Sequence, residues 1–202
     1  MNSTPTYPRT IDNGAGELLT FVRRVEDPAG DYLELESVTA PRGGPPMHVH
    51  RAQEEALTVQ QGRIGYQSAG GPELFAGVGE TVVFAPGEVH RFWNAGDEDL
   101  RCTGHVRPVG NLEYFLTAIY DSQREGGGSR PNPFDAAFLT RHFRDEFAIA
   151  EIPAPIQRLV FPLVVAVGRL LGKYGKYADA PEPVGRRGGP SPAPTVRARS
   201  GA

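Results

Sequence analysis

The sequence is poor in the features that mark secreted and disulfide-rich proteins. Its 202 residues include one cysteine, Cys102, so an internal disulfide is excluded, and we expect this side chain to be a small buried hydrophobe in a strand. The first sixteen residues contain no apolar run of the kind that a signal peptide requires. These absences favour a location in the reducing cytoplasm.

Charge of one sign is also missing from the chain as a whole. Lysine and arginine number 21 and aspartate and glutamate number 24, which leaves a formal net charge of −3. No global basic field therefore attracts nucleic acid or an anionic membrane. We expect no nucleic-acid partner, and other partners must be argued from specific sites.

No hydrophobic run is long enough to cross a bilayer. The longest uncharged run near the C-terminus, residues 159–168, has about half of the roughly twenty residues that a transmembrane helix needs, and Arg158 and Arg169 bracket it. Because this segment contains Pro162 and Gly168, we expect a bent, closely packed helix over residues 155–172 that lies against the folded domain or a second subunit. A helix on a membrane surface is the alternative.

Against these absences stand three histidines and a glutamate at strand spacing. Side chains alternate between the two faces of a β-strand, so His48 and His50 project to the same side and form a chelating pair. Glu55 begins the next apolar strand on the same face as its hydrophobic residues, where a bare charge is costly to bury. A divalent cation would remove that cost.

The fourth member follows forty residues after His50. Residues 80–84 read as a strand, Pro86 and Gly87 as a turn, and residues 90–94 as resumed extended structure, so His90, Phe92 and Asn94 share one face. A single histidine on a strand is more often a hydrogen-bonded structural residue than a ligand. The joint spacing of three histidines and one glutamate favours a metal site instead.

The two segments resemble the motifs of the cupin superfamily. The first cupin motif is a His-x-His pair, a glutamate four or five residues later and a glycine seven residues after that, matched here by His48, His50, Glu55 and Gly62. The second is a glycine, a Pro-x-Gly turn, a histidine and an asparagine, matched by Gly79, Gly87, His90 and Asn94.

The sequence departs from the second motif at one position and offers two glutamates for the first. Ala85 stands where the first proline of the second motif is usual, but the neighbouring Pro86 together with Gly87 can still fix the turn, so no ligand is affected. Glu54 also lies within the permitted spacing of the first motif. The seven-residue step to Gly62 and the strand parity favour Glu55, which leaves Glu54 facing solvent.

The resemblance implies a mainly β fold, a double-stranded β-helix or jelly roll, as in single-domain cupins with one conserved barrel and a helical C-terminal extension. We expect a polar arm at residues 1–16, a barrel at residues 17–108, a helical extension at residues 109–179 and a disordered Pro/Gly/Arg tail at residues 180–202. Eight strands are predicted within the barrel, over residues 17–24, 32–39, 47–51, 55–60, 63–67, 81–84, 90–94 and 100–106.

Helical periodicity begins after the predicted barrel. One helix is expected over residues 111–125, and a second opens at Asn132 as N-cap and Pro133 as first residue, with a face that continues to Phe147. We expect residues 126–129 to join the two helices as a flexible link, with a mobile lid as the alternative.

Strand alternation also predicts some of the residues that surround the expected metal site. Strand parity places Leu57, Val59, Phe92 and Asn94 in the pocket or around the ligands, together with Tyr66 if its strand faces inward on that parity. Such a mostly apolar pocket favours a small apolar or aromatic substrate. His105 on the last barrel strand is a minor catalytic candidate, and His142 a lesser one.

Four ligands leave about two positions open on an ion of octahedral preference, which suits substrate and oxygen. We therefore expect a dioxygenase-type oxidoreductase that uses one divalent metal ion, iron or manganese in preference to nickel, copper, cobalt or zinc. The alternatives are an oxygen-independent isomerase, lyase or cyclase, and a non-catalytic module that binds metal or a small molecule. A small-molecule ligand and a homodimer are the expected partners.

Overall fold

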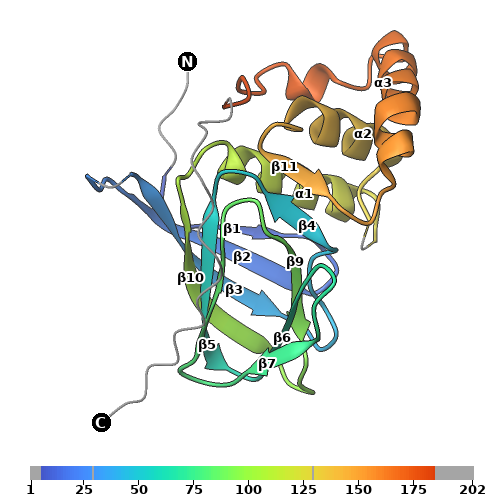
Figure 1. The fold of residues 1–202 in the computed structure, drawn as a ribbon. Helices are drawn as coiled ribbons and strands as arrows, with labels where there is room; N and C mark the ends of the chain where they lie inside the picture. The colour runs from blue at the N-terminus through green and yellow to red at the C-terminus, as the bar shows by residue number, and fades with distance from the viewer. Residues whose placement is uncertain (1–5, 29, 129, 185–202) are drawn as a thin grey trace.

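Two antiparallel β-sheets face each other and a layer of helices covers one end of them (Figure 1). The computed structural model describes residues 6–28, 30–128 and 130–184. The larger sheet has the strand order β1-β2-β3-β10-β5-β8 and the smaller one β11-β4-β9-β6-β7. The larger sheet consists of β1 (Arg9–Asp12), β2 (Glu17–Val25), β3 (Tyr32–Thr39), β10 (Leu100–Arg107), β5 (Glu54–Gln61) and β8 (Thr81–Phe84). The smaller sheet consists of β11 (Phe147–Ile149), β4 (His48–His50), β9 (Val89–Asn94), β6 (Ile64–Ser68) and β7 (Leu74–Ala76).

The predicted jelly roll with C-terminal helices is confirmed. All eight predicted strands form, each with ends within one residue of the expected positions. Their inward faces carry the alternate apolar residues, which form a buried cluster between the sheets. Cys102 belongs to this cluster, and burial raises the pKa of its thiol to about 11. The cluster consists of Leu57, Val59, Ile64, Ala76, Val82, Phe84, Leu100 and Cys102.

Three short strands were not expected from the sequence. β1 lies within the predicted polar arm and pairs with β2 of the same chain. Ile11 is its one buried residue, so the sequence has no alternation of apolar and polar residues that would predict this strand. β7 has three residues at the end of a hairpin. β11 begins at Phe147, which we expected on a helix face, and pairs with β4, so the second helix ends earlier than predicted.

Three α-helices follow the barrel strands. They are α1 (Leu112–Glu125), α2 (Pro133–His142) and α3 (Phe161–Leu170), with a π-helical turn η1 (Ile156–Val160) before α3 and a 3-10 turn η2 (Gly175–Tyr177) after it. Asn132 caps α2 as predicted, since its side-chain oxygen accepts a hydrogen bond from the Phe134 N–H at 2.9 Å. None of the described helices is long and apolar enough to cross a membrane.

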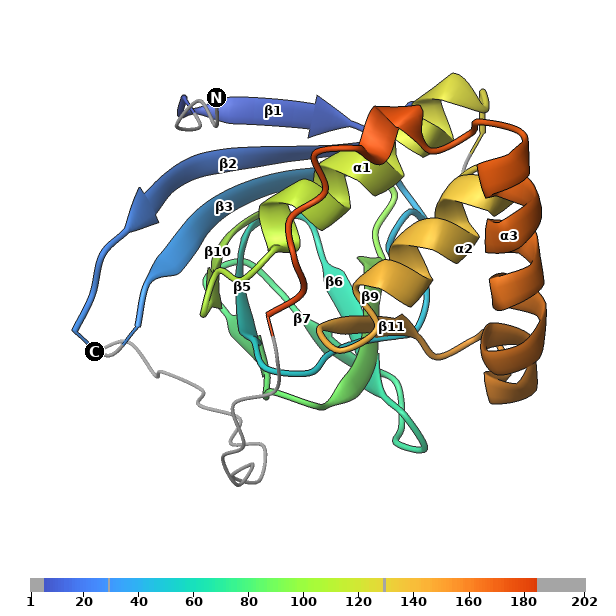
Figure 2. The same ribbon diagram turned by 90° about the horizontal axis from the view of Figure 1, so that it is seen from above.

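The helices bury the part of the large sheet that the smaller sheet leaves uncovered (Figure 2). Phe21, Leu33 and Leu35 of β2 and β3 pack in one cluster with Leu112 and Phe115 of α1. The same cluster includes Leu139 and Phe143 of the α2 region and Phe147 of β11. The helical extension is therefore part of the hydrophobic core.

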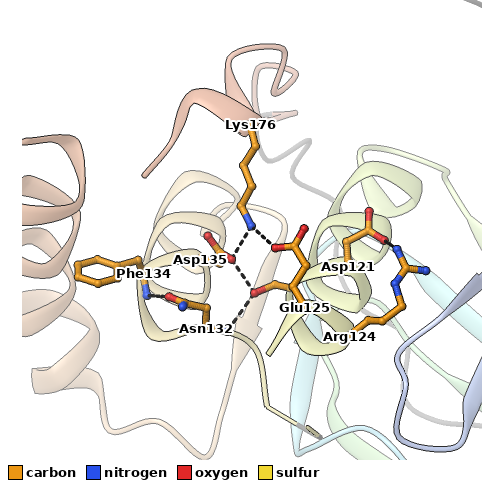
Figure 3. A network of polar contacts seen from close by, with 8 residues as sticks. Asp121, Arg124, Glu125, Asn132, Phe134, Asp135 and Lys176 are labelled. Carbon is orange, nitrogen blue, oxygen red and sulfur yellow. Dashed lines mark hydrogen bonds and ion pairs between the residues drawn. The ribbon is translucent and has the colours of Figure 1, made fainter. Parts of the chain in front are cut away.

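A buried carboxylate ties α1, α2 and η2 together (Figure 3). Asp135 accepts hydrogen bonds from the Ser122 hydroxyl at 2.7 Å and from the Lys176 ammonium at 2.8 Å, and Lys176 also donates to Glu125 at 2.9 Å. The Ser122 hydroxyl in turn accepts from the Asn132 N–H at 3.0 Å. Asp135 is thus buried with its hydrogen bonds satisfied, as a buried charge requires.

The predicted tail is ordered in its first residues. The Pro181 carbonyl lies 2.9 Å from His142 Nε2, and the Val184 N–H donates to buried Glu146 at 2.9 Å. Disorder predicted from residue 180 is therefore wrong for residues 180–184, because these hydrogen bonds bind the segment to the helices. Residues 185–202, and Ser129 of the expected link, lie outside the described residues.

Close approach of two central strands predicts a stability effect at Gly104. An alanine Cβ there would overlap the Ala56 carbonyl oxygen on β5, so Gly104→Ala should lower the free energy of unfolding by about 1–3 kcal/mol. Gly175→Ala is the matched control, because nothing lies within 4 Å of its Cβ, and we expect a change of at most about 0.5 kcal/mol. Urea unfolding of both variants measures this, and equal midpoints would contradict the close packing.

Candidate metal centre

Four side chains from three strands converge between the two sheets. His48 and His50 lie on β4, His90 lies opposite His48 on the neighbouring β9, and Glu55 faces them from β5 of the other sheet. Two β4 imidazoles reach the same space because they are two residues apart on one strand. The sandwich therefore brings together all four residues that the sequence predicts as ligands.

The donor atoms are as close to one another as ligands of one ion. His48 Nε2 lies 3.0 Å from His50 Nε2, and Glu55 Oε2 lies 3.2 Å from His90 Nε2 and 3.6 Å from His50 Nε2. All four donor atoms fall within 4.8 Å of one another. Metal–nitrogen and metal–oxygen bonds of about 2.1 Å place neighbouring octahedral ligands about 3 Å apart. The cluster could accordingly hold one metal ion.

Backbone carbonyls fix the orientation of two imidazoles. His48 Nδ1 lies 2.8 Å from the Pro46 oxygen, and His90 Nδ1 lies 3.0 Å from the Glu88 oxygen. A carbonyl can only accept, so both Nδ1 atoms donate and both Nε2 atoms face the cluster. His50 Nδ1 is buried without a hydrogen-bond partner among the described residues, so His50 is held by packing and by its Nε2 contacts.

The charge state of the cluster suits a cation. Burial lowers the pKa of His48 to about 3, with repulsion from His50 and His90 acting in the same direction, and burial also lowers the pKa of His50. Burial opposes ionisation of Glu55, but the hydrogen bond with His90 and the charges of the histidines outweigh it and lower its pKa to about 2. At neutral pH His48 and His50 are therefore neutral and Glu55 is a carboxylate, and imidazole and carboxylate are donor types that bind divalent metals.

Aromatic rings enclose the cluster. Phe84 stacks on His90 with ring centroids 3.8 Å apart, and Phe147 meets His50 edge-on at 5.6 Å. Phe147 was missed as a site residue because it lies nearly a hundred positions from His50 in sequence. No local sequence motif indicates that Phe147 belongs to the site, because the pairing of β11 with β4 is what brings its ring there.

The predicted pocket residues divide into two groups. Leu57 and Val59 are buried on the face of β5 that carries Glu55, and Tyr66 and Phe92 pack against the same apolar cluster. Asn94 shares the inward face of β9, but its amide donates to the Thr39 and Glu98 carbonyls and accepts from the Gly96 N–H. The Asn94 side chain is therefore bonded to the loop, and its expected place in or around the pocket stays a prediction.

The motif turns have the conformations that their residues allow. Gly62, Gly79 and Gly87 adopt φ of 84°, 85° and 80°, the left-handed region that favours glycine. The turn after β8 closes with a hydrogen bond from the Glu88 N–H to the Ala85 oxygen, on either side of Pro86 and Gly87. The Gly87 N–H donates to the His50 oxygen at 2.7 Å, which links this turn to the strand that carries two of the histidines.

The competing candidates point away from the cluster. Glu54 and His105 lie 3.5 Å apart on the outer face of the large sheet, with Tyr32 against the His105 ring. His142 contacts the Pro181 carbonyl on the helical side. The expected choice of Glu55 over Glu54 agrees with this geometry, and His105 does not reach the cluster.

We predict that His48→Ala loses most of the bound metal, because a three-ligand remnant lacks one arm of the β4 chelate. His105→Ala is the matched control and should retain the metal content of the unaltered protein, since its imidazole lies on the outer face. Elemental analysis of protein purified from its own host, followed by equilibrium dialysis, measures both. Equal metal content in His48→Ala and the unaltered protein would contradict the proposed ligand.

Acidification should destabilise the metal-free protein. An unfolded chain protonates its histidines below about pH 6.5, whereas the lowered pKa values of His48 and His50 keep both neutral in the fold. Stability is then lost as the pH falls from about 6.5 towards 4, by up to about 1.4 kcal/mol per pH unit for each imidazole. Urea unfolding with chelator at a series of pH values measures the slope, and His48→Gln should make it shallower. An unchanged slope in that variant would contradict the assignment.

Comparison with known proteins shows which family and which relatives this chain is similar to. A family model described as "Cupin domain" matches residues 35–106, which include all four clustered residues. "Oxidoreductase iacF" of Pestalotiopsis fici is 31% identical over 113 residues, which cover 51% of this chain and 55% of that protein. The chain thus spans about half the length of this curated relative.

Solved structures show similarity at a lower level. An uncharacterized conserved protein with a double-stranded β-helix domain from Klebsiella pneumoniae has 22% identity and a TM-score of 0.40, with 52% of this chain and 82% of that chain covered. KdgF from Halomonas sp. has 14% identity and a TM-score of 0.45, with 52% and 92% covered. Together with the two-sheet fold and both sequence motifs, the domain match shows that this chain contains a cupin domain over residues 35–106.

Proposed function

We propose that this cupin is a metal-dependent oxidoreductase of dioxygenase type that acts on a small, mostly apolar or aromatic organic molecule. The observation that carries the proposal is the buried convergence of His48, His50, Glu55 and His90, with donor atoms within 4.8 Å of one another. The relative from Pestalotiopsis fici is named an oxidoreductase, which supports the same reaction class.

The resident group we propose is one divalent ion, iron or manganese. When bound by these four residues, it would supply Lewis acidity and redox chemistry next to open coordination positions. Glu55 contributes the single negative charge of the site. His48 and His90 keep their Nε2 atoms aimed inward because the Pro46 and Glu88 carbonyls hold the opposite ring nitrogens.

The substrate class follows from the walls of the site. Phe84 and Phe147 cover the rings of His90 and His50, and Leu57 and Val59 continue the apolar surface beyond Glu55. Such walls exclude water, and the burial of apolar substrate surface against them contributes favourably to the free energy of binding. A phosphorylated sugar would need cationic side chains as partners. A planar enol, catechol or flavonoid fits these requirements best.

Assembly and location stay predictions of the sequence. A homodimer would be measured by sedimentation equilibrium, and a cytoplasmic location by fractionation of the native host. Neither is needed for the chemistry proposed here, because all four donor residues come from one chain.

The test is oxygen uptake by protein loaded with Fe(II) or, separately, Mn(II), in the presence of catecholic, flavonoid or enolic compounds. We expect substrate-dependent oxygen consumption that His50→Ala reduces by at least about a hundredfold, as expected when a ligand of the reactive ion is lost. His105→Ala should retain the rate, because its side chain lies on the outer face of the large sheet.

Two outcomes would overturn the proposal. Turnover at the same rate without oxygen would assign an isomerase, lyase or cyclase that uses the metal as a Lewis acid. Stable metal binding without turnover of any of these compounds would assign a binding module.

A further inference from the structure

An apolar stripe runs along the outward side of η1 and α3. Leu159, Leu163 and Leu170 are 69%, 67% and 88% exposed, and their spacing places them on one side of the helix. Contiguous exposed apolar surface of this extent marks an interaction site in most soluble proteins. The stripe consists of Ile156, Leu159, Val160, Leu163, Val167, Leu170 and Leu171.

The opposite side of this helix is already occupied. Val165 and Gly168 are buried, and α3 packs on α2. An added Cβ at Gly168 would overlap the Tyr174 hydroxyl, which donates to the Phe134 carbonyl of α2 at 3.3 Å, and the Tyr174 ring stacks on Phe138. α3 therefore cannot rotate its leucines inward without losing this packing. It lies at the outer edge of the helical layer, beyond α2 (Figure 2).

The charged side chains of the segment between Glu151 and Asp179 have one sign. Residues 152–178 contain four cationic side chains and no aspartate or glutamate. Lys176 is paired with Asp135 and Glu125, but Arg158, Arg169 and Lys173 are exposed and enter no ion pair with the described residues. Helical geometry places Arg158 and Arg169 on one flank of the leucines, and Lys173 follows just after the end of α3. A chain of net charge −3 thus concentrates free positive charge beside its most exposed apolar surface.

This charge pattern distinguishes between the partners that could cover the apolar stripe. A second copy packed stripe to stripe would bring arginines and lysines of both copies together with no carboxylate on either helix to neutralise them. Burial of the stripe against the described part of this chain is excluded by the packing of α3 on α2. An anionic lipid surface complements both features, since its acyl boundary accepts the leucines and its headgroups accept the cations.

We propose that η1 and α3 form an interfacial helix that docks this protein on anionic lipid bilayers, with the apolar stripe in the acyl boundary and Arg158, Arg169 and Lys173 at the headgroups. The helix lies on the bilayer and does not span it, consistent with the absence of a long apolar helix among the described residues. The inference is independent of the reaction proposed above.

Vesicle flotation of the full chain tests the proposal. Vesicles of phosphatidylcholine with phosphatidylserine should bind the protein at least tenfold more tightly than vesicles of phosphatidylcholine alone, with binding that weakens as salt is added. Replacing the three cations by glutamine should cost roughly a hundredfold on the anionic vesicles, at roughly fivefold for each charge.

Apolar substitutions separate insertion from charge attraction alone. Leu163→Gln with Leu170→Gln should lower binding to anionic vesicles at least tenfold, since each buried leucine contributes about 1.5 kcal/mol or more, which is over tenfold in partitioning. Leu74→Gln with Phe75→Gln is the matched control, because both are exposed apolar residues on the distant β7 and should leave binding unchanged. All variants keep Arg186, Arg187, Arg197 and Arg199, so a loss is attributable to the helix.

Metal content and circular dichroism verify that each variant is folded. Three results would overturn the proposal: no flotation with anionic vesicles, equal flotation of the leucine double variant, or a concentration-dependent dimer that this double variant dissociates in sedimentation equilibrium. The last result would assign the stripe to a second copy of the chain.

Discussion

The burial of one carboxylate among three imidazoles is the constraint on which the rest of this structure depends. Glu55 lies on an apolar strand face inside a sandwich, where an unpaired charge is costly to bury. The histidines reduce that cost by the hydrogen bond with His90 and by their proximity, but lowered pKa values keep His48 and His50 neutral at neutral pH, with nitrogen lone pairs available. A cation at the centre neutralises the carboxylate and takes up the lone pairs, so the arrangement makes physical sense as a binding site rather than as a core.

The C-terminal extension belongs to this arrangement. β11 adds a strand beside β4 and supplies Phe147 against His50, while α1 and α2 bury the remaining face of the large sheet. Buried Glu146 connects these parts, because its carboxylate accepts from Asn111 at the start of α1 and from Val184, and its carbonyl accepts from the Arg51 N–H just after β4. Removing the extension would expose both the core and one wall of the site. Only the outer side of α3 is left without a partner in the described chain.

Local sequence signals predicted most barrel strands from apolar positions over four or more residues, and predicted the three-residue β4 from its His-x-His pair. They failed for β1, β7 and β11, which have three or four residues and at most one buried side chain each. Phe147 illustrates the limit: it continues the helical spacing of Phe143, yet the chain leaves the helix after His142 to pair with β4. Asn94 illustrates a second limit of sequence-based prediction. Its side chain lies on the inward face of β9 as predicted, but strand alternation did not indicate that its hydrogen bonds are made to the loop.

The sequence by itself determined the four clustered residues, the sheet class and the positions of the tight turns. Strand parity, the two-residue step from His48 to His50 and the glycine conformations are local properties of the chain. Tertiary structure alone decided which aromatic rings enclose the site, which glutamates serve as structural anchors and which side of α3 stays outside. These depend on contacts between segments far apart in the chain, where packing and the pairing of buried charges outweigh local preference.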